Sequence, residues 1–148
     1  MATLTSTITE SVILNGNNQG SSNTLSVTGI NDVYKRIVKC TASQTTVIAN
    51  FGATVHAAAS NIDVEDTRYI RLTNLDSTNS ITVAMVGASD NFQVVVPAGH
   101  SIVFGTPDNF MLGEADTTPA FTGYEDLSSI QVNPGGNAVS VELFIATV

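Results

Sequence analysis

Two histidines and a single cysteine are the side chains of this sequence that could serve as a base or a nucleophile. The histidines are His56 and His100, Cys40 is the only thiol, and Ser101 follows His100 just after a Pro-Ala-Gly sequence. A Cys–His or Ser–His–Asp site needs a base that a third group orients within hydrogen-bond reach, and the spacing provides no such group. The sequence also lacks a G-x-S-x-G nucleophile elbow. We therefore expect a turn histidine at position 100, a buried cysteine and no enzymatic activity.

Carboxylates are densest in the segment Asp63-Val64-Glu65-Asp66. Strand alternation would place Asp63 and Glu65 on one face, where they could bind Ca²⁺ together with loop carbonyls. The alternative is a solvated loop or a sheet edge that the charges protect, and the missing EF-hand spacing favours it. We expect no metal site and no cofactor. The same interpretation, a solvated surface, applies to the other acidic side chains considered: Asp108, Glu114, Asp116 and the pair Glu125-Asp126.

Two arginines flank an aromatic residue in the middle of the chain. Arg68 and Arg71 lie on either side of Tyr69-Ile70, and Arg and Tyr are enriched in the cores of protein interfaces. They could pair with the surplus of carboxylates, within a subunit or between subunits. We therefore identify Arg68, Tyr69 and Arg71 as candidate interface residues. The polar stretch at residues 15–23 could approach a ligand, but a flexible surface connection is the favoured interpretation.

The charge balance argues against several partners. The chain has 148 residues, with 5 basic and 13 acidic side chains and a net charge of −8. A nucleic-acid backbone needs a basic patch, and an anionic membrane surface would repel such a protein. We expect no nucleic-acid and no membrane partner. Residues 1–7 lack the basic and apolar parts of a secretory signal, so we expect no secretory signal there.

The composition is that of an all-β protein. The sequence has 17 Val and 11 Ile against 8 Leu, together with 19 Thr and 14 Ser. β-branched residues favour a pleated sheet over long helices. Eight to ten short strands, at spacings of roughly 8–14 residues, predict one antiparallel β-sandwich or jelly-roll-like domain over residues 1–148.

Alternation of apolar and polar residues predicts where the strands lie. Residues 2–14 read as one long strand, and residues 15–23 as a surface loop. The other expected strands are residues 25–27, 33–42, 47–49, 69–74, 80–86, 92–96, 101–104, 110–112, 129–132 and 138–148. Residues 47–49 could pair with 54–58 as a hairpin, or residues 57–59 could begin a helical turn, and the sequence leaves both open.

Two hairpins are expected in the second half of the chain. Residues 69–74 and 80–86 would form one, with Ile70 and Leu72 inward, and residues 129–132 and 138–148 the other. The last strand is the most regular. Its core face should carry Val139, Val141, Leu143 and Ile145, with Glu142 wet or at an interface.

Residues 69–101 resemble small structural proteins of tailed bacteriophage virions. The segment Y-I-R-L-T-N-L-D-S-T-N-S-I-T-V at residues 69–83 is similar to a pattern in which a strand ends in x-N-L-D-x-T-N and turns into an I-x-V strand. The segment V-V-V-P-A-G-H-S at residues 94–101 is similar to a strand that closes on P-[AG]-G-[ED]-x. His100 stands where that pattern commonly has an acidic residue.

The resemblance implies a non-enzymatic building block of the virus particle. Members of this size with an acidic, Ser/Thr-rich sandwich are similar to capsid decoration (cement) proteins, which bind the major capsid protein and stabilise the shell at the capsid surface. The alternative is a receptor- or carbohydrate-binding knob of a tail or fibre. Sugar sites usually present exposed aromatic side chains, and the absence of Trp, with only 3 Tyr, favours the decoration protein.

Self-association is also expected. An open sandwich has strand edges that invite pairing, and only 12% of the residues are charged to protect them. Residues 1–14 are the candidate arm, because the polar stretch at 15–23 separates them from the rest. A trimer would match the local three-fold positions of a capsid shell. The competing possibility is a monomer whose terminal strand pairs within its own sheet.

Overall fold

The protein is all-β in a computed structural model that describes residues 1–54 and 60–148. The described residues contain no helix, and hence none that could cross a membrane. Their thirteen strands are β1 (Ala2–Thr9), β2 (Ile13–Leu14), β3 (Asn17–Asn18), β4 (Ser22–Ile30), β5 (Asp32–Cys40), β6 (Thr46–Gly52), β7 (Asn61–Asp63), β8 (Thr67–Asn74), β9 (Ile81–Val86), β10 (Asn91–Val96), β11 (Ser101–Phe104), β12 (Ser129–Asn133) and β13 (Val139–Thr147).

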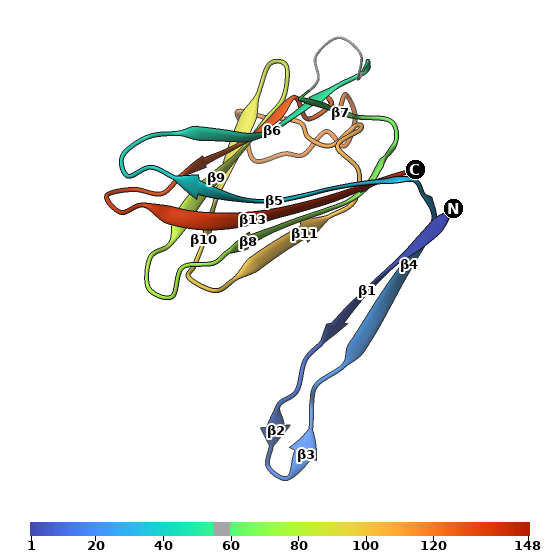
Figure 1. The fold of residues 1–148 in the computed structure, drawn as a ribbon, viewed down its shortest axis with the longest axis vertical. Helices are drawn as coiled ribbons and strands as arrows, with labels where there is room; N and C mark the ends of the chain where they lie inside the picture. Colours follow the sequence, from blue (N-terminus) through green and yellow to red (C-terminus); the bar gives the residue numbers. More distant parts are fainter. Residues whose placement is uncertain (55–59) are drawn as a thin grey trace.

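Two sheets form the sandwich (Figure 1). Sheet I has the strand order β10-β9-β12-β6-β7, and sheet II has the order β11-β8-β13-β5. All pairs are antiparallel except β6 with β7, which run parallel. The predicted all-β sandwich is therefore confirmed. These two sheets use nine of the described strands, and the other four lie outside them.

The core lies between the sheets and follows the predicted alternation along β13. Val139 is 1% exposed, while Val141, Leu143 and Ile145 are fully buried. They pack against the inward side chains of sheet I, including Val83 of β9. Glu142, as expected, lies on the opposite face of the strand.

The two hairpins expected in the second half of the chain are wrong. β8 belongs to sheet II and β9 to sheet I, so the segment between them crosses the sandwich. β12 and β13 are divided between the sheets in the same way. The inward residues were identified correctly, since Ile70 and Leu72 are fully buried. Alternation defines which face of a strand is buried, but it does not say whether the next strand pairs beside it or packs opposite it.

The four remaining strands form a protruding arm at the N-terminus, here called the ribbon (residues 2–30). β1 pairs with β4, and β2 pairs with β3 farther out. Figure 1 shows the ribbon leaving the sandwich beside sheet II and ending in the β2–β3 turn. The expected single strand over residues 2–14 is wrong, because β1 ends at Thr9. The expected loop at residues 15–23 is also wrong, because β3 and the start of β4 lie in it.

A two-residue turn closes the ribbon tip. Asn15 and Gly16 have φ values of 52° and 80° and lie between the paired residues Leu14 and Asn17. Positive φ at both central residues is the geometry that Asn-Gly favours in hairpins, since it matches the twist of the flanking strands. This dipeptide was the sequence signal for the turn.

The hairpin expected between residues 47–49 and 54–58, and the helical turn considered at 57–59, fall mainly on residues 55–59, outside the described residues. Residues 47–49 themselves lie in β6. That strand pairs with β12 and, in parallel, with β7.

Truncation of the core face of β13 should destabilise the protein strongly. Leu143→Ala should lower the free energy of unfolding by about 2–5 kcal/mol, because it removes buried methyl groups and leaves a cavity. Ser140→Ala, on the outer face of the same strand, should change it by less than about 0.5 kcal/mol. Urea unfolding of both variants measures this, and equal losses would contradict the register.

Candidate functional site

Among the described residues, no hydrogen bond joins the candidate nucleophile Cys40 to the candidate base His100. Cys40 is fully buried at the end of β5, and burial raises the pKa of its thiol against a smaller lowering by the Thr46 hydrogen bond. A thiol with a raised pKa forms little thiolate, the reactive species. His100 lies exposed in the turn before β11, with its Nδ1 2.9 Å from the Ala98 carbonyl oxygen. The predicted buried cysteine and turn histidine are confirmed, and His56 lies outside the described residues.

The acidic segment at residues 63–66 forms a turn. The Asp63 carboxylate accepts hydrogen bonds from the N–H groups of Glu65, at 2.9 Å, and Asp66, at 3.2 Å. Both bonds go to one oxygen, Oδ1, and give the carboxylate a role in holding the turn. Within residues 1–54 and 60–148, no three His, Cys, Asp or Glu side chains gather closely enough to hold a metal ion.

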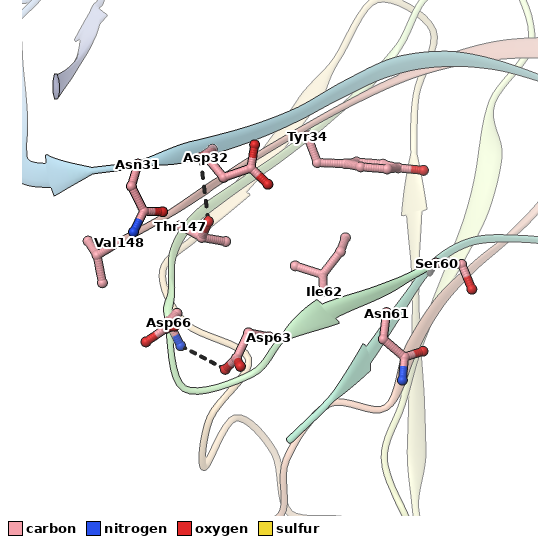
Figure 2. Close-up of a pocket in the computed structure, with 10 residues that line it drawn as sticks. All are labelled: Asn31, Asp32, Tyr34, Ser60, Asn61, Ile62, Asp63, Asp66, Thr147 and Val148. Carbon is pink, nitrogen blue, oxygen red and sulfur yellow. Dashed lines mark hydrogen bonds between the residues drawn. The ribbon is translucent and has the colours of Figure 1, made fainter. Parts of the chain in front are cut away.

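A cavity of about 330 Å³ lies beside this turn (Figure 2). Asp32, Asp63 and Asp66 contribute to its lining, together with the chain end at Thr147 and Val148. The bonds drawn in Figure 2 are local. The Thr147 hydroxyl donates to the Asp32 carbonyl, and the Asp66 N–H donates to Asp63. The Thr147 bond joins the end of β13 to β5, and the Val148 N–H, which donates to the Asp66 carbonyl at 2.9 Å, joins it to the 63–66 turn.

One of the expected solvated carboxylates is instead structural. Glu125 is half-buried, and its carboxylate accepts the N–H groups of Ser89 and Asp90, both at 3.0 Å. A Cβ on Gly87 would stand 2.0 Å from a Glu125 carboxylate oxygen, so a larger residue there would displace this carboxylate from its bonds. The expectation of a solvated pair was wrong for Glu125. Asp126 is exposed, as expected.

The segment at residues 69–101 contains a corner of the sandwich. Asn74 is fully buried at the end of β8, and its Nδ2 donates to the carbonyls of Asn79, Val96 and Pro97. This one amide ties the segment after β8 to the segment after β10. The N-L-D-x-T-N pattern thus corresponds to a connection between the two sheets.

The outer face of sheet II is the most distinctive surface of the sandwich. It consists of the side chains that point away from the core: Val33, Lys35, Ile37, Lys39, Tyr69, Arg71, Thr73, Ser101, Val103, Ser140, Glu142, Phe144 and Ala146. Three of the five basic residues of this acidic protein lie here. Apolar side chains are uncovered between them, with Val33 46%, Ile37 60% and Val103 42% exposed.

A network of charges fixes the centre of this face. Arg71 Nη2 lies 2.5 Å from one Glu142 carboxylate oxygen, and Lys35 Nζ lies 3.8 Å from the other. The Arg71 guanidinium also stands 5.9 Å from the centre of the Phe144 ring and donates to the Thr73 hydroxyl. Because the single carboxylate of Glu142 pairs with both Arg71 and Lys35, this face keeps a net positive charge.

The ribbon has one apolar face and one hydroxyl face. Cross-strand pairing places Leu4 opposite Val27 and puts Ile8 and Leu25 on the same side. The other side carries hydroxyl pairs such as Thr7 with Thr24, whose oxygens are 3.0 Å apart. The alternation of strand side chains thus makes an amphipathic ribbon from a Thr/Ser-rich sequence.

Only the base of the apolar ribbon face is covered. Leu4 and Val27 pack against a small cluster with Tyr69 and Ala146 of sheet II. The Ser6 and Tyr69 hydroxyls are 2.9 Å apart, which fastens the base further. Farther out, Ile8 is 51% and Leu25 is 47% exposed. Covering a fully exposed side chain of this size would contribute about 1.5–3 kcal/mol.

The ribbon tip is apolar as well. Val12, Ile13 and Leu14 are 51%, 67% and 60% exposed. These side chains bury little surface against their own chain, and an exposed apolar run of this kind is a candidate site of protein interaction.

Of the three candidate interface residues, the structure brings two together at the ribbon base. Tyr69 and Arg71 line a cavity of about 330 Å³ with the ribbon residues Leu4 to Thr7 and with Phe144. Arg68 stands apart, and its guanidinium donates to the backbone carbonyls of Glu65 and Thr67. Sequence reasoning missed Leu25 and Ile37 as surface residues. The alternation around them was visible, but not which face stays uncovered.

No protein-family model and no curated protein matches the chain. Among solved structures, a chain from work on Bacillus endospore appendages, described as a novel family of disulfide-linked pili, is similar at 12% sequence identity and a TM-score of 0.40. The match covers 82% of this chain and 94% of that chain. A TM-score below 0.5 carries no argument about function.

The melting temperature should not depend on calcium. We expect the same value in excess Ca²⁺ and in excess chelator, because no three possible ligand side chains gather within the described residues. A ligand that binds the native state stabilises it by mass action. A substantial rise with Ca²⁺ that the chelator reverses would contradict this expectation, and Mg²⁺ is the matched control for ionic strength.

Asp76 should contribute stability that depends on pH. Its carboxylate accepts the N–H groups of Asn79 and Thr78, and these bonds lower its pKa below the ordinary value of about 3.9. The contribution is therefore complete above that ordinary pKa and is lost as the pH falls through the lower, folded-state pKa. Asp76→Ala should be less stable than the parent at pH 6, and the gap should close in strong acid.

Thermal unfolding between pH 6 and pH 2 measures this difference. The exposed Glu65→Ala serves as the control and should follow the parent throughout. A gap between parent and Asp76→Ala that stays constant over the whole range would show that the carboxylate charge plays no part.

Proposed function

We propose that this protein is a non-enzymatic structural protein of a bacteriophage virion, a capsid decoration protein that binds the major capsid protein and stabilises the shell. Two lines support the proposal. Residues 69–101 resemble virion proteins, and the ribbon offers an uncovered apolar surface at the end of a protruding arm. The resemblance suggests a place in the virus particle, and the exposed apolar surface suggests that the protein acts by binding another protein.

The exposed ribbon tip is the observation that carries the proposal. Val12, Ile13 and Leu14 are held out from the sandwich by the paired strands behind them. A partner with an apolar groove could enclose them and gain hydrophobic stabilisation at little cost, because the turn is already formed. In the proposed role, the ribbon tip binds the major capsid protein.

A second candidate function is a carbohydrate- or receptor-binding knob, and one feature favours it. A groove of about 420 Å³ crosses the outer face of sheet I, with Asn91, Gln93, Gln131 and Asn133 in its lining. Amide side chains can both donate to and accept from sugar hydroxyls. The groove lining includes no aromatic ring for a sugar to stack on, so capsid decoration remains the preferred proposal.

The test is binding to empty capsids assembled from the major capsid protein of the same genome. We expect the parent chain to co-sediment with the capsids and to raise their melting temperature. Ile13→Asp/Leu14→Asp should lower the affinity about tenfold or more, as hot-spot residues do.

The matched control is Asn17→Asp/Asn18→Asp, which places the same charges on the partner strand of the same small hairpin. It should bind like the parent, and circular dichroism should show all three chains folded. Absence of parent binding would overturn the capsid proposal. A glycan array with the parent chain would then test the knob, with Gln93→Ala/Gln131→Ala as its loss-of-binding variant.

A further inference from the structure

The stem of the ribbon, formed by β1 and β4, and the outer face of sheet II are two largely uncovered surfaces, here called the ribbon wall and the sheet wall. They meet at the ribbon base and diverge from there. At the base they touch, through Leu4 and Val27 on one side and Tyr69 on the other. Beyond the base, Ile8 and Leu25 line the ribbon wall, and the sheet wall carries exposed apolar side chains of its own. The small cavity under Leu4 to Thr7 marks where the walls begin to part.

The base contact shows which two surfaces suit each other. Within one chain, the apolar ribbon face already packs on the outer face of sheet II, with Val27 and Leu4 against Tyr69 and Ala146. Continuing that contact would bring Leu25 and Ile8 onto the same kind of surface. The chain cannot continue it alone, because its own ribbon diverges from its own sheet (Figure 1).

The distribution of charge also favours contact between a ribbon and the outer face of sheet II. The first thirty residues contain one charged side chain, Glu10. The sheet wall carries Lys35, Lys39 and Arg71 against the single carboxylate of Glu142. The remaining acidic side chains are spread over the rest of the molecule, so a ribbon with little charge of its own meets least repulsion at this basic face.

The dimensions also agree. β1 has 8 residues and β4 has 9, while β5 and β13 of the receiving sheet have 9 each. At about 3.4 Å per residue, the paired strands β1 and β4 and the receiving strands are each close to 30 Å long. The β1–β4 part of one ribbon can therefore follow the part of a second copy's sheet II face that its own ribbon base leaves uncovered, and the β2–β3 tip lies farther out.

We propose that the ribbon stem of one copy docks, through Ile8 and Leu25, on the outer face of sheet II of a second copy, around Val33 and Ile37. The two surfaces differ, so the contact is heterologous and can close into a ring. This deepens the proposed function, because it supplies the contact between copies and leaves the ribbon tip free for the capsid.

Sedimentation velocity of the chain alone tests the contact without any capsid. We expect the parent to self-associate as its concentration rises. A stem variant, Ile8→Asp/Leu25→Asp, and a face variant, Val33→Asp/Ile37→Asp, should each weaken association about tenfold or more.

Two matched controls carry the same charges elsewhere. Thr9→Asp/Thr24→Asp lies on the hydroxyl face of the ribbon, and Val47→Asp/Val95→Asp lies on the outer face of sheet I. Both should associate like the parent. Thermal melts establish that each variant folds. Concentration-dependent protection of β1 and β4 amides from hydrogen exchange in the parent gives a readout that needs no variant.

Mixing the two defective chains is the decisive step. The stem variant keeps an intact face and the face variant keeps an intact stem, so an equimolar mixture should recover a heterodimer. A parent that stays monomeric, or a mixture that stays monomeric while the parent associates, would overturn the proposal. The second outcome would indicate a symmetric contact between two ribbons or two β5 edges.

The capsid test fails or succeeds separately. Loss of capsid binding with intact self-association would remove the proposed function and keep this contact. Capsid binding by a chain that never self-associates would keep the proposed function and remove this contact.

Discussion

A two-stranded ribbon has no interior, and this constraint governs how the N-terminal fifth of the chain can be stable. Backbone hydrogen bonds join β1 to β4, but each side chain has only the face of the ribbon to pack on. Isolated hairpins are marginal in water, and a third strand or another packed surface is needed for independent stability. This chain provides such a surface only at the ribbon base, where Leu4 and Val27 meet Tyr69. The hydroxyl face can be satisfied by water, whereas the apolar face beyond the base cannot.

The sandwich that carries the ribbon is well packed and its connections are tied together. Its core is filled from both sheets, and buried polar groups tie the connections between them, as Asn74 does through three carbonyls. Among the described residues, no buried side-chain nitrogen or oxygen lacks a partner. Arg71 is held by Glu142 and Thr73, and it also lines the cavity under the ribbon.

The sequence identified the faces of strands better than their partners. Alternation correctly marked Val141 and Leu143 as core, because burial on one face of a strand follows directly from a period of two. The crossings between sheets depend on contacts such as Asn74 with Val96, which are distant in sequence and invisible to a local pattern. Glu125 was misjudged for the same reason, since it accepts hydrogen bonds from Ser89 and Asp90.

The Asn-Gly turn was a local signal, and the surrounding polar residues obscured it. Tyr69 and Arg71 were predicted as interface residues from residue type alone, while the exposure of Ile37 depends on which elements cover sheet II.

Charge distribution explains how a protein with uncovered apolar surfaces could remain dispersed until it is assembled. A net charge of −8 repels copies at long range and supports solubility. That repulsion is weakest where Lys35, Lys39 and Arg71 gather, so an approaching copy meets the least resistance at the outer face of sheet II. The ribbon brings almost no charge to that face, and hydrophobic contact can then decide the short-range fit. In the proposed contact, repulsion elsewhere and hydrophobic contact at one face would together favour a single orientation, which is what a closed ring requires and what random aggregation through Ile13 or Leu14 would lack. The acidity that repels copies over the rest of the surface would thus also select how they meet.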